Sequence, residues 1–250
     1  MSSPFSKEPK AGLAYVQSRI SSPSLSPETY RKWYEEAHIP DVLRACAPNI
    51  VSAHRFHSSD TAKTDYPYLT LYPVRDTAWL RTDDCSFFRV DLHHELLPGP
   101  SDSPERGFIF DVARFDFRFY ERVGRVGEYV GVPQFIVVKQ LDDSDIKQKG
   151  DDGLDEHGLQ DRILSQSRAA IAEGSKSKPV CSTLYKLDFV PPRPKKEGHN
   201  SQDAESVPGP AKCLVIHEYE EAPKEGVVAA DDSALEFSLL STFGDSRGEW

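Results

Sequence analysis

The sequence predicts an α+β fold in which two ferredoxin-like repeats follow one another and close into one barrel with helices outside. The order strand, helix, strand, strand, helix, strand can be read over residues 12–120, and it starts again at residue 134. The run Tyr-Leu-Thr-Leu-Tyr at 68–72 matches Cys-Leu-Val-Ile-His at 213–217 in place and pattern. A single repeat would leave one apolar sheet face uncovered, and two such sheets facing each other bury both.

Composition excludes several classes of function. The chain has 250 residues and a net charge of −10, which argues against a nucleic-acid-binding surface. No stretch approaches the roughly 18 apolar residues of a membrane span, and residues 1–10 lack the apolar middle of a signal peptide. The four cysteines form no Cys-x-x-Cys pair, so no metal site is indicated. We expect a cytoplasmic monomer or homodimer with neither a nucleic-acid nor a membrane partner.

The first repeat is expected over residues 11–122, after a disordered N-terminus at 1–10. Its strands are predicted at 12–20, 50–57, 67–72 and 108–120. Because strand side chains alternate, Leu69 and Leu71 should face away from Tyr68, Thr70 and Tyr72. In the fourth strand, phenylalanines at 115, 117 and 119 should share one face. A second helix is predicted to start at 76–81 and to continue toward residue 92.

The first helix, over residues 26–45, is the best marked element. Ser26 can cap its first turn, Pro27 suits the first helical position, and Glu28 meets the positive end of the helix dipole. Pro40 lacks a backbone donor and crowds the preceding turn. We therefore expect the helix to kink or restart there, with His38 at the break.

The second repeat is expected over 133–250, after a glycine-rich linker at 123–132. Its strands are predicted at 134–139, 180–189, 213–219 and 234–243, with helices at 156–173 and 225–231. Residues 191–210 are rich in proline, lysine and serine, and they predict a mobile loop.

The first helix also carries a dense set of functional groups. Tyr30, Trp33, Tyr34 and His38 fall three or four residues apart and share one broad face. Asp41 lies near enough in sequence to hold one imidazole nitrogen. Aromatic residues at this spacing more often pack in a core, and a single histidine is more often structural, so both interpretations stay open.

The sequence resembles the EthD-like branch of the dimeric α/β-barrel superfamily, in its long fungal type with two halves in tandem. The resemblance rests on Tyr-x-x-Trp-Tyr-x-x-x-His-Ile-Pro-Asp at 30–41, on the strand 68–72 and on Ile-His-Glu at 216–218. It implies an intramolecular dimeric α/β barrel with a cavity between sheet and helices in each half, and with His38 facing the first cavity. Members include polyketide cyclases, decarboxylases, cofactor-free monooxygenases that oxidise anthrones, and haem-associated proteins.

Combined with the resemblance, the residues suggest acid–base chemistry. His38 would move a proton, and Tyr34 or Tyr72 would donate a hydrogen bond to a developing phenolate or enolate oxygen. The side chains predicted to bind substrate are Tyr30, Trp33, Tyr68, Thr70 and His217, the last because it is the counterpart of Tyr72 in the second repeat.

Three functions follow as alternatives. The first is a cofactor-free enzyme that oxidises, cyclises or decarboxylates an aromatic or polyketide-like molecule. The second is a non-catalytic, small-molecule-binding or stress-associated barrel. The third is a haem-dependent enzyme with His38 or His217 on the iron, which rests on the family resemblance alone.

Overall fold

The computed structural model describes residues 8–58, 60, 62–99, 106–128, 131–142, 156–174, 178–191, 211–223 and 234–245. The predicted helix at 225–231 and nearly all of the predicted loop at 191–210 lie outside the described residues. None of the described helices is long and apolar enough to cross a membrane.

The elements of each half follow the ferredoxin-like order. The first half contains β1 (Gly12–Ile20), α1 (Pro27–Lys32), the π-helix η1 (Trp33–His38), α2 (Ile39–Cys46), β2 (Ser52–His57), β3 (Tyr68–Val74), the 3₁₀ turns η2 (Thr77–Arg81) and η3 (Phe87–Arg89), β4 (His93–His94), β5 (Gly107–Phe108), α3 (Ile109–Val112) and β6 (Ala113–Gly127). The second half contains β7 (Phe135–Leu141), α5 (Glu156–Gly174), β8 (Cys181–Phe189), β9 (Cys213–Tyr219) and β10 (Ala234–Gly244).

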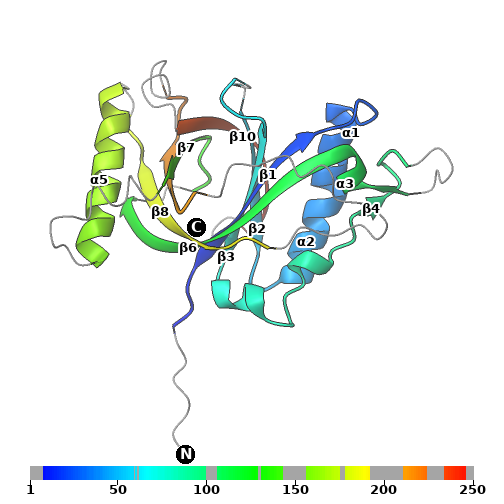
Figure 1. The fold of residues 1–250 in the computed structure, drawn as a ribbon, viewed down its shortest axis with the longest axis horizontal. Helices are drawn as coiled ribbons and strands as arrows, with labels where there is room; N and C mark the ends of the chain where they lie inside the picture. The colour runs from blue at the N-terminus through cyan, green and yellow to red at the C-terminus, as the bar shows by residue number, and fades with distance from the viewer. Residues whose placement is uncertain are drawn as a thin grey trace, which may run out of the picture.

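Eight antiparallel strands close into one barrel in the order β1-β3-β2-β10-β7-β9-β8-β6 (Figure 1). Each half contributes the ferredoxin-like order, as β6-β1-β3-β2 and as β10-β7-β9-β8. The halves are joined by the pairs β2–β10 and β6–β8. The predicted fold class, two ferredoxin-like repeats forming an intramolecular dimeric α/β barrel, is confirmed.

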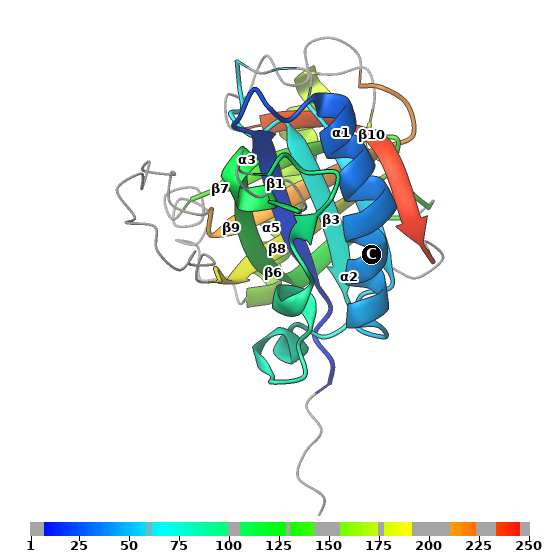
Figure 2. The ribbon, with the colours of Figure 1, turned by 90° about the vertical axis from the view of Figure 1, so that its right-hand side faces the viewer.

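Side-chain alternation sorts the apolar residues into layers. Leu69 and Leu71 of β3 belong to the core inside the barrel, whereas Tyr72 belongs to a second core under the first helix. A third core lies between α5 and the outer face of the second sheet. The helices therefore cover the barrel from outside, with α1 and α2 on one half and α5 on the other (Figures 1 and 2).

Two predictions in the first half were wrong in detail. The predicted second helix is replaced by the short 3₁₀ turns η2 and η3. Local polar bonds mark both ends of the first of these: the Asp76 carboxylate accepts the Ala78 N–H at its start, and the Thr82 hydroxyl donates to the carbonyl oxygen of Trp79 at 2.8 Å at its end. The predicted strand 108–120 begins instead with the single helical turn α3, which turns Ile109 and Val112 into the core.

Strand β6 also runs to Gly127, into the segment assigned to the linker. The glycines of this segment suggest a loop in the sequence, but in the structure they belong to a strand that pairs with β8. The pairing with β8 shifts register between Arg122 and Gly124, and a Cβ at Gly124 would lie 3.1 Å from Leu164 of α5. The absence of a side chain thus lets helix α5 approach the strand closely.

The first helix begins as predicted. The Ser26 hydroxyl accepts the Thr29 N–H at 3.0 Å, and Pro27 is the first helical residue. Pro40 does not stop the helix: the backbone stays right-handed helical and widens into the π-helix η1, which ends at His38. A π turn bonds residues five apart, as the Ile39 N–H does with the Tyr34 carbonyl, and this changes which side chains share a face.

Candidate functional site

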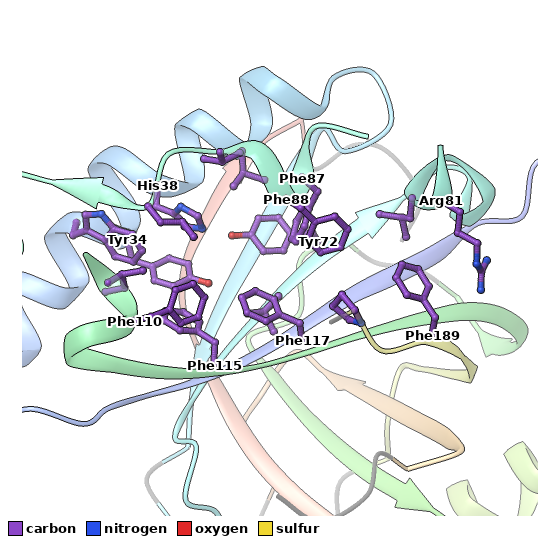
Figure 3. A pocket seen from close by; sticks show the side chains of 18 residues that line it. Tyr34, His38, Tyr72, Arg81, Phe87, Phe88, Phe110, Phe115, Phe117 and Phe189 are labelled. Carbon is purple, nitrogen blue, oxygen red and sulfur yellow. The ribbon is translucent and has the colours of Figure 1, made fainter. Parts of the chain in front are cut away.

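A cavity of about 460 Å³ lies between the outer face of the first sheet and the helical layer (Figure 3). Its volume is in the usual range for small-molecule sites. The helix supplies Trp33, Tyr34 and His38, and strand β3 supplies Tyr72. Much of the remaining wall is phenylalanine, from residues 87, 88, 110, 115, 117 and 189.

The π-helix places His38 over Trp33. Their rings are stacked, with centroids 4.8 Å apart and 15° between planes. Residues five apart would point about 140° away from each other in an α-helix, whereas a π turn brings them together. Tyr34 meets the same imidazole edge-on at 5.2 Å. The histidine is therefore held between two aromatic rings at the cavity wall.

Burial keeps the imidazole of His38 neutral. It lowers the pKa of His38 to about 4, and the nearby Asp41 carboxylate opposes this only in part. The expected hydrogen bond from the His38 imidazole to Asp41 is not formed: Asp41 accepts from Arg44 at 2.6 Å. Nδ1 of His38 is buried and has no hydrogen-bond partner among the described residues. The prediction that Asp41 orients the ring was therefore wrong.

Tyr34 and Tyr72 complete a polar end of the cavity. Figure 3 shows their side chains and His38 pointing toward one another. Burial raises the pKa of both phenols, and the proximity of Tyr34 raises that of Tyr72 further. Both therefore stay protonated and able to donate at neutral pH. In the described part of the chain, the Tyr72 hydroxyl makes no hydrogen bond of standard geometry, although it lies close enough to Tyr34 to affect its pKa.

A buried arginine supports this end from behind. Arg55 is fully buried, donates to Oε1 of Glu35 at 2.9 Å, and lies 4.7 Å from the ring centre of Tyr34. It also lies over the rings of Tyr30 at 5.3 Å and Tyr68 at 5.2 Å. Sequence reasoning missed Arg55 and Glu35, because an alternating strand and a helix surface give no sign that these charges meet.

The other predicted binding residues do not reach the cavity. Tyr30 is buried and donates from its hydroxyl to Oγ of Ser18 at 2.7 Å, and Tyr68 packs on Tyr30. Thr70 is buried outside the cavity wall. His217 faces α5 in the second half, where Ser167 and Ser182 bond its two ring nitrogens at 3.0 and 2.8 Å. Both ring nitrogens of His217 are thus engaged by side chains of the second half.

Neither candidate histidine has the hydrogen bonding that is usual for a haem ligand. An axial histidine turns one nitrogen to the iron, and an acceptor holds the other. Nδ1 of His38 is buried without an acceptor in the described residues, and one face of the ring lies on Trp33. Both nitrogens of His217 are engaged by serines. Within the described ranges, no cluster of three or more His, Cys, Asp or Glu side chains could hold a metal ion.

No known family profile matches the chain, and no curated protein is similar to it in sequence. Among solved structures, it resembles a monooxygenase-like protein of Fusobacterium nucleatum, with 7% identity and a TM-score of 0.43, covering 95% of this chain and 96% of that one. A point mutant of chlorite dismutase from Candidatus Nitrospira defluvii matches with 10% identity and a TM-score of 0.44, over 94% of this chain and 93% of that one. Similarities this low say nothing about what this chain binds or does. By its own geometry, the chain is a barrel of two ferredoxin-like halves with a cavity over the first sheet.

Proposed function

We propose that the chain is a cofactor-free enzyme that moves a proton on an aromatic or polyketide-like molecule bound in the cavity. The observation that carries the proposal is the meeting of His38, Tyr34 and Tyr72 at one end of an otherwise apolar cavity. We further assign the chain to the EthD-like branch, in its two-half fungal type, on the motif at 30–41.

The electrostatics limit the kind of reaction. An imidazole whose pKa lies near 4 is a weak base at pH 7, so it suits only a carbon or oxygen acid that is already activated. Phenols and β-dicarbonyl carbons of polyketides are such acids. As the proton leaves, negative charge grows on the substrate oxygen, and the Tyr34 and Tyr72 hydroxyls can donate to it. The resulting carbanion can cyclise or react with O₂. In a β-keto acid, the same two hydroxyls would stabilise the enolate that loss of CO₂ leaves behind, and a proton then completes the product.

Hydrogen–deuterium exchange tests the proposal without knowledge of the final product. Anthrone in D₂O carries an acidic CH₂ group next to two aromatic rings, and NMR follows the loss of its signal. We expect the wild-type chain to accelerate exchange, and His38→Gln to reduce the acceleration by about 10²-fold or more. The exposed His93 provides the control, because His93→Gln should leave the rate unchanged. Equal rates with wild type and His38→Gln would remove His38 from the mechanism.

A non-catalytic binding protein is the second candidate, and one observation favours it. The cavity walls are mostly phenylalanine and aliphatic, and no acceptor orients the imidazole among the described residues. This alternative predicts that anthrone binds equally to wild type and His38→Gln and that neither accelerates exchange. Fluorescence titration beside the exchange measurement separates the two functions.

A further inference from the structure

The two ends of the cavity differ in chemistry. Figure 3 shows His38 and Tyr34 at one end, and Arg81 with Phe189 at the other. Tyr34 and Tyr72 are each 1% exposed, so water hardly reaches their side chains. The side chain of Arg81 is 50% exposed and Phe88 is 48% exposed, so the cavity opens beside them. A ligand would enter past Arg81 and reach the histidine with its far end.

Arg81 is held in place at this opening. Its guanidinium lies 4.8 Å from the ring centre of Phe189, which also lines the cavity. Nη1 and Nη2 pair with the carboxylate of Asp188, each at 2.7 Å, and Nη2 also donates to the Asp188 carbonyl at 3.1 Å. Nε has no partner among the described residues, and the guanidinium fork has a geometry that suits carboxylates.

We propose that the natural ligand is an elongated apolar or aromatic carboxylic acid, whose carboxylate sits on Arg81 while its far end lies at His38. This rests on the proposed function and names the substrate class of the same cavity. A carboxylate strongly prefers to keep contact with water, which the open end allows and the phenylalanine walls do not. Asp188 competes with the ligand for Arg81, so the pair sets how strongly the acid is held.

The proposal predicts opposite effects from the two partners. Fluorescence titration would compare 1-pyrenebutyrate with its uncharged analogue, 1-pyrenebutanol, on the full chain. We expect the wild type to bind the acid more tightly, Arg81→Gln to weaken binding of the acid by about tenfold, and Asp188→Asn to tighten it several-fold. Binding of the alcohol should stay within about twofold in both variants, which also reports an intact cavity. Arg44→Gln is the matched control, since Arg44 forms an exposed ion pair away from the cavity.

Three results would overturn the proposal. One is equal affinity of the wild type for acid and alcohol, the second is an equal effect of Arg81→Gln on both probes, and the third is binding of neither probe by the wild type. The anthrone exchange test is independent of these outcomes, because anthrone carries no acid. Loss of exchange in His38→Gln together with no effect of Arg81→Gln on 1-pyrenebutyrate would keep the proposed function and reject this inference.

Discussion

The imidazole of His38 lies parallel to the indole of Trp33, five residues earlier in the chain, with ring centroids 4.8 Å apart. This contact exists because the helix widens to a π turn just before Pro40. The ring is therefore presented to the cavity by a local backbone feature and by an aromatic neighbour, and no charged partner orients it among the described residues.

Trp33 should be a main source of stability in the first half. It is 1% exposed and packs against Tyr30 and Tyr34 as well as His38. Trp33→Ala is expected to lower the free energy of unfolding by about 3–5 kcal/mol, measured by urea denaturation. Trp79, only partly buried on a 3₁₀ turn, gives the comparison: Trp79→Ala should have a clearly smaller effect. Equal effects would contradict the packing described here.

Stability should fall as the solution becomes acidic. Burial lowers the pKa of His38 and His54 to about 4 and that of His217 to about 3, while histidine in an unfolded chain titrates near about 6.5. As the pH falls from about 6.5 toward 4, the unfolded chain protonates these histidines and the folded chain does not, so their contribution to the free energy of unfolding decreases. Glu218, whose pKa is raised to about 7 by burial, acts in the opposite direction and offsets part of this loss.

The contribution of one histidine can be isolated by difference. His38→Gln should reduce the slope of unfolding free energy against pH by about one proton between pH 6 and 4.5, because all other titrations are shared with the wild type. Urea denaturation at several pH values measures the slope. An unchanged slope would mean that His38 titrates normally in the folded protein.

Arg55 should matter more than any exposed arginine. It is buried among three tyrosine rings and pairs with Glu35, which also accepts from Ser241 of β10 at 2.9 Å. Arg55→Met leaves the Glu35 carboxylate without its buried partner, and we expect a loss of about 3 kcal/mol in unfolding free energy.

A double-mutant cycle tests the Arg55 contact directly. Combining Arg55→Met with Glu35→Gln should restore part of the stability, since the carboxylate that lost its buried partner and keeps only the exposed Arg31 is removed. Arg44→Met, which breaks only an exposed pair, should change stability little. Additive effects of the two changes at positions 55 and 35 would argue against a coupled pair.

Substitution of His217 should change the stability of the protein and leave ligand binding in the cavity of His38 unchanged. Both serine bonds of His217 are buried, so His217→Ala is expected to destabilise the second half by about 1–3 kcal/mol. The same change should leave the affinity of the cavity for 1-pyrenebutanol unchanged, because His217 lies on the other half. A specific loss of ligand affinity in a folded His217→Ala variant would mean that His217 does contribute to ligand binding.

The fold was largely predictable because it depends on side-chain period and on the internal repeat. Strands β1 and β9 begin and end at the expected residues, and the pattern of Tyr68–Tyr72 gave the correct inner and outer faces. The predicted elements were wrong where local structure departs from the pattern of apolar residues. These places are the polar turn after Trp79, the single helical turn at 109–112 and the glycines of β6.

The site was predictable only in part. His38, Tyr34, Trp33 and Tyr72 line one cavity, as the helix face and the strand alternation suggested. The pairing of Arg55 with Glu35 and that of Arg81 with Asp188 were not foreseen, because each joins two different elements, and the side-chain period of one element does not show which charge on another it meets. The stack of His38 on Trp33 also needs a π turn, which spacing alone does not predict.

The most direct test of the account is an intermolecular NOE measurement between bound anthrone and the aromatic protons of the chain. We predict contacts from anthrone to the His38 imidazole and to the Tyr72 ring, with none to His217. Anthrone contacts confined to other surfaces, with none to His38, would contradict the claim that this histidine faces the ligand.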